Sequence, residues 1–447
     1  MDRRSRPRLA TLERNDYYMN VIDMRENKEN DLYSRLVSRS QIDNGDVLKT
    51  VEEIIKDIKQ NGDKAVLKYT KKFDKAELTC ETQRVTEEEI NEAFDAADAK
   101  FIDVLIKAKA NIESFHMKQR ENSWFSPEKD GVILGQLYRA LEVVGVYVPG
   151  GTAAYPSSVL MNVIPAKVAG VERVVMVTPP GQNGKVNPSI LAAAKIAGVA
   201  EIYKVGGAQA IAALAHGTES IPKVDKIVGP GNIYVAMAKK MVYGYCDIDM
   251  IAGPSEIMVV ADESANPTFV AADMLSQAEH DVLASAILVT TSEYVAKSVQ
   301  LELERQVDFL DRKEILLKSL ADYGAIVIVE SIDEAIKVVN NIAPEHLELC
   351  VEEPFNLLSY IKNAGAIFLG NYSSEPLGDY FAGPNHVLPT SGTARFFSPL
   401  NVSDFIKKSS VISYTRKALE KVKEDVILFA EKEGLTAHSN AIKVRFL

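Results

Sequence analysis

Apolar and charged positions alternate at helical spacing over residues 45–125. The stretch VEEIIKDIKQNGDKAVLKYTKKFD, which begins at Val51, places apolar residues three and four apart, and Gly62 interrupts it. This spacing predicts amphipathic helices, each with one face against a core.

From residue 141 onward, short apolar runs rich in β-branched residues alternate with helical segments. The strands expected first are 174–180, 202–205 and 226–229, and the helices are 190–199, 208–217 and 232–242. Strands that alternate with helices pair in parallel through helical crossovers.

The same alternation repeats in the second half of the chain. Further strands are expected at 256–262, 286–292, 325–331 and 366–370. Asn266 is the expected N-cap of a helix over 266–280, with Pro267 at its first position. The runs VVMVTPP and AILVTTS look alike, which indicates two similar α/β units. The tail from residue 401 is expected to be helical as far as Gly434.

Composition is that of a soluble globular protein with more than one domain. The chain has 447 residues, of which 47% are hydrophobic and 25% charged, and a net charge of −11. The acidic balance disfavours non-specific nucleic-acid binding and favours a small-molecule substrate. The three cysteines form no CxxC, which is typical of a reduced, intracellular protein. The N-terminus has no apolar core of a secretory signal, and its basic RRSRPR run is interpreted as a solvated chain end.

The segment APEHLEL, residues 343–349, is a candidate acid/base site. Pro344 ends the helix expected over 331–341, so Glu345 and His346 lie in a turn or at the start of a strand. From there both side chains can face one cleft, where histidine is the commonest general base and a carboxylate can orient water. A polar loop that solvates a helix end explains these residues equally well.

Other polar residues could form a metal site. Gln277 and His280 are three apart and share a helix face, and Asp379 and His386 lie in the glycine- and proline-rich loop GDYFAGPNHVLP. His438 lies near the C-terminus. Each of these residues also has a purely structural explanation: a polar helix end, a tight loop or an isolated histidine. If they converge, one Gln, one Asp and two His would make a divalent-metal site.

Two glycine-rich loops are candidate ligand sites because loops at the carboxyl ends of parallel strands bind ligands in such sheets. They are VGVYVPGGTAAYPSS, 144–158, and GDYFAGPNHVLPTSGTA, 378–394. The dinucleotide fingerprint GxGxxG is absent, since GPGNIY departs from it, so the residues alone do not lead to NAD.

Seven long motifs in order resemble the histidinol dehydrogenase family over about residues 45–447. They are YVPGGTAAYPSSVLMNVIPAKVAG, VGGAQAIAALAHGTESIPKVDKIVGPGN, DMIAGPSEIMVVAD, LSQAEHD, APEHLEL, GDYFAGPNHVLPT and LTAHSNA. The resemblance implies an NAD-dependent, zinc-containing oxidoreductase. Its reaction would be the four-electron oxidation of L-histidinol to L-histidine through bound L-histidinal with two NAD⁺, the last step of histidine biosynthesis.

The resemblance also implies residue roles. His346 matches the base that accepts the hydroxyl proton, and Glu345 matches the group that activates water. One Zn²⁺ per subunit would be held by Gln277, His280, Asp379 and His438. The NAD contacts would be Tyr147, Gln209 and Asn232. The substrate contacts would be Ser255, Gln277, His280, His346, Asp379, Glu433 and His438, with His386 a weaker one. No cysteine nucleophile is needed, so Cys350 is expected in the core.

The family fold implies two Rossmann-like domains with incomplete parallel sheets, plus small helical N- and C-terminal segments. The expected division is 1–44 as a helical arm, 45–140 with 255–395 as one α/β domain, 141–254 as the NAD-binding domain and 396–447 as a tail. The implied assembly is a cytoplasmic homodimer whose tails cross over, so that Glu433 and His438 serve the partner's site. No nucleic-acid or membrane partner is expected.

Two alternatives remain at this point. A zinc- and NAD-dependent dehydrogenase of the same superfamily could act on another alcohol, such as sulfopropanediol; Glu433, His386 and His438 favour histidinol. A metal- or nucleotide-binding module without activity would not need the Glu345–His346 pair, which is intact.

Overall fold

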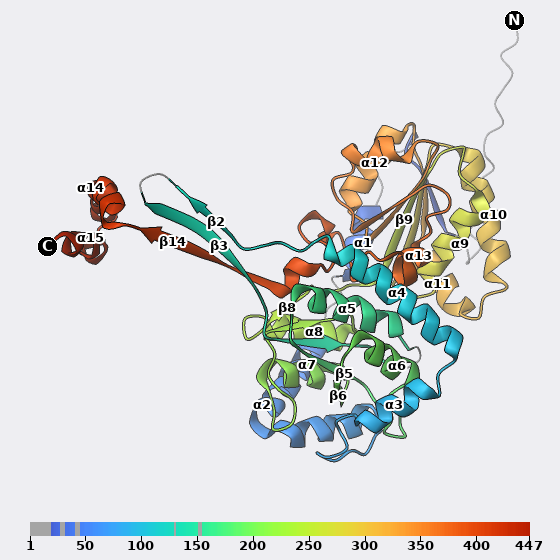
Figure 1. Cartoon of the computed structure of the whole chain (residues 1–447). Coiled ribbons are helices and arrows are strands. Elements are labelled where there is room, and N and C mark those ends of the chain that lie inside the picture. The colour runs from blue at the N-terminus through green and yellow to red at the C-terminus, as the bar shows by residue number, and fades with distance from the viewer. Residues whose placement is uncertain (1–18, 27–31, 41–44, 129–130, 151–153) are drawn as a thin grey trace, which may run out of the picture.

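The computed structural model describes residues 19–26, 32–40, 45–128, 131–150 and 154–447. Two α/β units lie side by side, and a three-stranded arm extends from them and carries the C-terminal helices (Figure 1). The predicted α/β class with two parallel-sheet units is confirmed. The basic RRSRPR run lies outside the described residues.

A six-stranded parallel sheet forms one unit. Its strands, in spatial order, are β1 (Asn20–Asp23), β11 (Ala325–Ile328), β10 (Ser285–Thr290), β9 (Glu256–Ala261), β12 (His346–Cys350) and β13 (Ala366–Leu369). One face packs against α9 (Pro267–Ala278), α10 (Glu293–Val307) and α11 (Lys313–Tyr323). The other packs against α1 (Leu32–Ser40) and α12 (Ile332–Ile342). Because both faces are buried, the strands read as continuous apolar runs.

A five-stranded parallel sheet forms the other unit. Its strands, in spatial order, are β6 (Glu201–Lys204), β5 (Arg173–Thr178), β4 (Val143–Tyr147), β7 (Lys226–Val228) and β8 (Asp247–Ile248). One face packs against α3 (Glu87–Asp95), α4 (Ala99–Met117), α5 (Pro156–Ala169) and α6 (Pro188–Ala197). The other packs against α2 (Gly45–Phe73), α7 (Gly207–His216) and α8 (Ile233–Val242).

The expected domain grouping differs from the observed packing. Helices α2, α3 and α4 were grouped with residues 255–395, yet their apolar faces pack in the unit of the five-stranded sheet. The expected helical arm over 1–44 contains β1, which pairs with β11 at the edge of the six-stranded sheet. An amphipathic pattern identifies a buried helix face but not the partner that covers it. Gly62 interrupts α2 as predicted, with φ 49° and ψ −131°.

The arm is an antiparallel sheet of β2 (Trp124–Pro127), β3 (Val132–Ala140) and β14 (Ile406–Tyr414). It leads to α14 (Arg416–Lys432) and α15 (Thr436–Lys443), which lie away from the body (Figure 1). The prediction of a helical tail from residue 401 was wrong for 406–414. This segment pairs along its whole length with β3, from Ile406 opposite Ala140 to Tyr414 opposite Val132.

Short helical turns occur after β12, in the last part of the chain. They are the 3₁₀ turns Pro354–Tyr360, Thr393–Arg395, Val402–Phe405 and Val444–Phe446, the short helix α13 (Glu375–Leu377) and the π-helical turn η2 (Gly378–Ala382). The η2 turn lies against α4, where the Asn111 side chain donates to the carbonyl of Phe381 at 2.9 Å. This contact joins a loop of the six-stranded unit to a helix of the other. No helix within the described ranges combines the length and apolar character needed to cross a bilayer.

Phe405, in the turn Val402–Phe405, has none of its surface exposed and belongs to the core beside α5. Phe405→Ala is therefore expected to lower the unfolding free energy of this unit by about 3–5 kcal/mol. Phe309→Ala is the control, because Phe309 is 76% exposed and its loss should cost within about 0.5 kcal/mol. Urea unfolding followed by circular dichroism measures both, and equal midpoints would contradict the packing role of Phe405.

Candidate functional site

Glu345 and His346 lie at the amino end of β12. Helix α12 ends at Ile342, Ala343 adopts a left-handed conformation with φ 55°, and Pro344 prevents the helix from continuing. The strand then begins at His346 between β9 and β13. The turn-then-strand geometry predicted for APEHLEL is thus present. Both side chains are buried, with residue exposures of 6% and 3%.

The backbone of Glu256, the first residue of β9, contacts both members of this pair. Its N–H donates to Glu345 Oε2 at 2.8 Å, and its carbonyl accepts from His346 Nδ1 at 3.0 Å. Because Nδ1 donates to this carbonyl, Nε2 is the ring nitrogen that remains for proton exchange with a substrate. That nitrogen is buried and makes no hydrogen bond. The pair therefore offers Nε2 as the ring nitrogen that can exchange a proton, next to a buried carboxyl group.

Burial and charge shift the pKa of both groups. Burial raises the pKa of Glu345 to about 8, and the neighbouring His346 charge opposes this only in part. Burial alone lowers the pKa of His346, but the surrounding carboxylates, chiefly Glu345 and Asp379, outweigh it and raise the pKa to about 10. Negative charge around His346 is therefore in excess.

Three side chains next to His346 have the donor types and spacing of a metal site. One ligand atom each from His280, Glu375 and Asp379 lie within 4.8 Å of one another. His346 Nε2 is 3.7 Å from Asp379 Oδ1 and 4.0 Å from Glu375 Oε1. The pKa of Glu375 is raised to about 8, by burial first and then by the Asp379 charge. An imidazole and two carboxylates in so small a space suit a divalent cation.

Gln277 lies on the last turn of α9, and its side chain is buried. Its Oε1 has no hydrogen-bond partner, an unusual state for a buried amide. A cation at the neighbouring triad would supply the missing partner. The predicted ligands Gln277, His280 and Asp379 therefore fit such a site, whereas Glu375 was not singled out from the sequence. Its signal in the sequence is weak, because it lies four residues before Asp379 in a segment of half-buried serines and a proline.

The fourth predicted ligand lies elsewhere in this single chain. His438 is exposed on α15, and Glu433 is exposed at the end of α14, both beyond the arm (Figure 1). The structure of one chain does not bring them to the triad.

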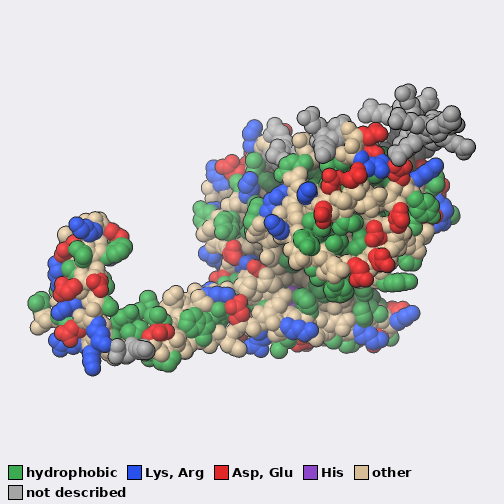
Figure 2. Space-filling view, turned by 90° about the horizontal axis from the view of Figure 1, so that it is seen from above, with side chains coloured by type: hydrophobic (Ala, Val, Ile, Leu, Met, Phe, Trp, Pro, Cys, Tyr) green, Lys and Arg blue, Asp and Glu red, His purple; other side chains and the backbone are tan. Residues whose placement is uncertain are grey.

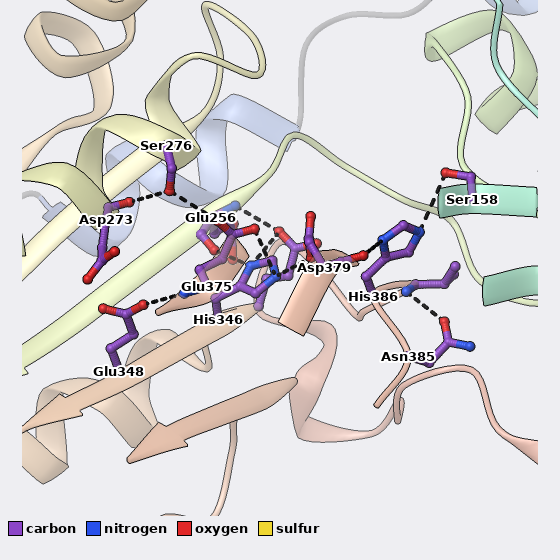
Figure 3. A network of polar contacts seen from close by, with 12 residues as sticks. Ser158, Glu256, Asp273, Ser276, His346, Glu348, Glu375, Asp379, Asn385 and His386 are labelled. Atoms are coloured by element: carbon purple, nitrogen blue, oxygen red, sulfur yellow. Dashed lines mark hydrogen bonds and ion pairs between the residues drawn. The ribbon is translucent and has the colours of Figure 1, made fainter. Parts of the chain in front are cut away.

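His386 links the triad to the other α/β unit. Its Nδ1 donates to the carbonyl of Asp379 at 3.1 Å, and its Nε2 is 3.5 Å from Ser158 Oγ on α5 (Figure 3). With both nitrogens engaged, His386 holds loops together in this structure. A cavity of about 760 Å³ opens beside His346, Asp379 and His386.

The predicted cofactor contacts lie at the carboxyl edge of the five-stranded sheet. Tyr147 ends β4, Gln209 is in the first turn of α7, and Asn232 caps α8 by accepting from the N–H groups of Tyr234 and Val235. The Tyr147 hydroxyl accepts from the Gly207 N–H at 3.2 Å. Both polar atoms of the Gln209 amide are buried without partners, which fits a polar ligand group there.

We expected the site to lie in loops at the carboxyl ends of the parallel strands. Only the predicted cofactor contacts of the five-stranded unit lie at such an edge. In the six-stranded unit, Glu345 and His346 come from the amino edge, and Ser255 directly precedes β9 at the same edge. The two functional edges belong to different sheets, and His386 and Ser158 bridge them. The sequence did not predict a further buried ion pair next to the site. The guanidinium of Arg39, on α1, pairs with the carboxylate of Glu256.

Comparisons with known proteins agree with the geometry. The model of the histidinol dehydrogenase family matches residues 37–446. The chain is 60% identical over 414 residues to histidinol dehydrogenase of Clostridium acetobutylicum, covering 93% of this chain and 96% of that one. It is 59% identical over 418 residues to the enzyme of Listeria monocytogenes, covering 93% and 97%.

A solved structure extends the likeness to the whole fold. The crystal structure of histidinol dehydrogenase from Elizabethkingia anophelis matches with a TM-score of 0.89 and 41% identity, covering 96% of this chain and 98% of that one. The resemblance seen in the sequence motifs is confirmed, and the chain belongs to the histidinol dehydrogenase family.

Proposed function

We propose that the protein catalyses the NAD-dependent oxidation of L-histidinol to L-histidine, the last step of histidine biosynthesis, in the cytoplasm. Family membership at 60% identity supports the substrate. The observation that carries the chemistry is the buried pair of Glu345 and His346. His346 Nε2 lies 3.7 Å from the carboxylate of Asp379, a member of the metal-type triad. The family leaves open an alcohol other than histidinol, and turnover of each substrate separates the two.

His346 acts as the general base of both oxidations. In the first, Nε2 accepts the hydroxyl proton of histidinol while the carbinol hydride leaves, so the alcohol becomes the aldehyde. In the second, Glu345 accepts a proton from water as the water oxygen bonds to the aldehyde carbon, and the aldehyde oxygen takes up the proton that His346 gained in the first oxidation, which leaves His346 free to act as a base again. His346 then accepts a hydroxyl proton of the hydrated aldehyde as a second hydride leaves, and the carboxylic acid forms.

The chain's own residues would position the cofactors. NAD⁺, when bound by Tyr147, Gln209 and Asn232, accepts the hydride of each oxidation, one molecule per step. Gln277, His280, Asp379 and His438 would hold one Zn²⁺ per subunit, which would supply a Lewis-acidic centre that helps to position the substrate. Glu375, in the same cluster, is an additional candidate ligand. Ser255 and Glu433 complete the substrate contacts.

A homodimer with exchanged tails would complete the site. The arm exposes large apolar side chains that a monomer would leave in water: Trp124 and Phe125 on β2 are 49% and 54% exposed, and Ile412 on β14 is 72% exposed. Figure 2 shows hydrophobic side chains gathered along this projection. Surfaces of this kind mark protein–protein contacts. A second copy that covers the arm could receive His438 and Glu433 in its own site.

Replacing His346 tests the general-base role. His346→Asn should lower the single-turnover rate of histidinol-dependent NADH formation by about 10²–10⁴-fold, because no other group takes the proton. His216→Asn is the matched control: His216 lies on α7 beside Tyr245, away from the site. Near-normal rates for His346→Asn in stopped-flow absorbance would rule out this role.

Replacing Glu345 tests the water-activating role and its pH dependence. Since the pKa of Glu345 is raised to about 8, its carboxylate form appears as pH rises through that value. Oxidation of added L-histidinal should therefore accelerate between about pH 7 and pH 9. Glu345→Gln should slow this step more than the alcohol step and flatten the rise. Equal small losses in both steps, or an unchanged pH profile, would contradict the assignment.

Mixed dimers test tail exchange. Asp379→Ala and His438→Ala homodimers should each be inactive, since each lacks a ligand in both sites. Refolded together, heterodimers should regain about one working site, because one site then has both wild-type residues. Activity and zinc content of the tag-purified heterodimer provide the measurement. No recovery would indicate that each tail serves its own subunit.

A further inference from the structure

An ion pair buried in the five-stranded unit holds the loop after β7 by its backbone. The ammonium of Lys239, on α8, pairs with the carboxylate of Asp249, which follows β8, and their side chains are only 3% and 1% exposed. Lys239 Nζ also donates to the carbonyl of Gly229 at 3.0 Å, and Asp249 Oδ2 accepts from the Gly229 N–H at 2.7 Å. One ion pair thus binds both polar backbone groups of a single glycine.

Gly229 is a position where the backbone has little freedom to move. Its φ is +113°, a conformation that side-chain-bearing residues rarely adopt. A Cβ added there would lie 2.0 Å from the carbonyl oxygen of Tyr147, so the two backbones are in close contact. A small displacement of Gly229 would therefore be transmitted to Tyr147.

The same loop leads directly to a second predicted cofactor contact. Gly229 is followed by Pro230, Gly231 and Asn232, and Asn232 caps the helix that carries Lys239. The backbone from Gly229 to Lys239 and the Lys239 side chain therefore form a closed ring. The hydrogen bond from Lys239 Nζ to the Gly229 carbonyl closes it, and Asn232 lies within it at the start of α8. Asn232 belongs to this ring and Tyr147 contacts it, and Lys239 and Asp249 belong to the five-stranded unit, whereas the metal-type triad is formed by His280, Glu375 and Asp379.

Joining two elements by a buried ion pair has a large desolvation cost in free energy. Removing both charges from water costs several kcal/mol per ion, and apolar side chains of similar volume often stabilise a fold as well or better. What apolar side chains cannot supply is a donor for the Gly229 carbonyl and an acceptor for its N–H. The specific contribution of this ion pair is therefore its two hydrogen bonds to the backbone of Gly229, and not added stability of the fold.

We propose that Lys239 and Asp249 are positioning residues for the cofactor: they fix Gly229 so that Tyr147 and Asn232 are held in the arrangement that binds NAD⁺. This inference rests on the proposed function. It assigns to the pair an effect on cofactor binding that is separable from metal binding and from the proton transfers of Glu345 and His346.

The neighbouring pair of Lys226 and Asp247 provides a matched control. It joins β7 to β8, with Nζ and Oδ2 2.9 Å apart, but Asp247 is 51% exposed and the Lys226 ammonium bonds to Asp247 rather than to the Gly229 loop. Asp247→Asn therefore makes the same chemical change as Asp249→Asn two residues away, without touching the cofactor loop.

The test compares Lys239→Met, Asp249→Asn and Asp247→Asn with the wild-type enzyme. The dissociation constant of NAD⁺ is measured by calorimetry, together with kcat, the KM of NAD⁺ and of histidinol, and zinc content. For Lys239→Met and Asp249→Asn, the NAD⁺ dissociation constant and KM should rise on the order of tenfold or more. The kcat at saturating NAD⁺, the KM of histidinol and the zinc content should stay within about twofold. Asp247→Asn should match the wild type throughout.

A purely structural role gives a different result. In that case the variants would lose melting temperature and active fraction while the folded molecules bind NAD⁺ within twofold of the wild type, and the inference would be overturned. If the single variants do not fold, Lys239→Met/Asp249→Leu leaves no unpaired buried charge, and the same NAD⁺ criterion applies to it. Wild-type NAD⁺ binding is measured first: its absence refutes the proposed function itself, whereas normal wild-type binding with unaltered variants refutes only the positioning role.

Discussion

Burying two ionisable side chains next to each other costs free energy unless each one finds a partner, and the site depends on how the six-stranded sheet supplies those partners. Glu256 begins β9 directly beside β12, so its backbone can donate to Glu345 and accept from His346. Its own carboxylate is buried in turn and is paired with Arg39 from α1. The Glu345–His346 pair is therefore held by the start of β9 and by α1, and His346 Nε2 lies 3.7 Å from Asp379 Oδ1 in the triad.

Negative charge accumulates around that nitrogen. Burial alone raises the pKa of Asp379, but the neighbouring His346 and the charge of His386 outweigh it and lower the pKa to about 2, so Asp379 keeps its charge. Glu375 is next to it, and its backbone N–H donates to Glu348, a further buried carboxyl whose pKa is raised by burial and by Asp273 (Figure 3). A cluster so rich in carboxylates is balanced when a divalent cation is bound, which is consistent with the unpartnered Gln277 oxygen beside it.

The two sheets contribute different parts of the chemistry from opposite kinds of edge. The amino edge of the six-stranded sheet carries Glu345 and His346, the proposed acid/base pair, and the carboxyl edge of the five-stranded sheet carries the predicted cofactor contacts. The two units are joined by apolar packing of Val387 with α5 and by polar links that include His386 to Ser158 and Asn111 to the carbonyl of Phe381. Hydride transfer needs the cofactor and the reacting carbon in contact, so these links determine whether the two halves act as one site.

The sequence by itself determined the local features, because they depend on neighbours along the chain. Alternating apolar runs predicted the parallel strands, Pro344 placed Glu345 and His346 at a turn before a strand, and Asn266 was correctly expected to cap α9. The motifs also identified the family. Tertiary structure alone decided what depends on distant contacts. It assigned α2–α4 to the five-stranded unit, made residues 406–414 a strand by pairing them with β3, and brought Glu375 and Arg39 to the site. The spacing of residues along the chain predicts none of these features, because each depends on contacts with residues that are distant in the sequence.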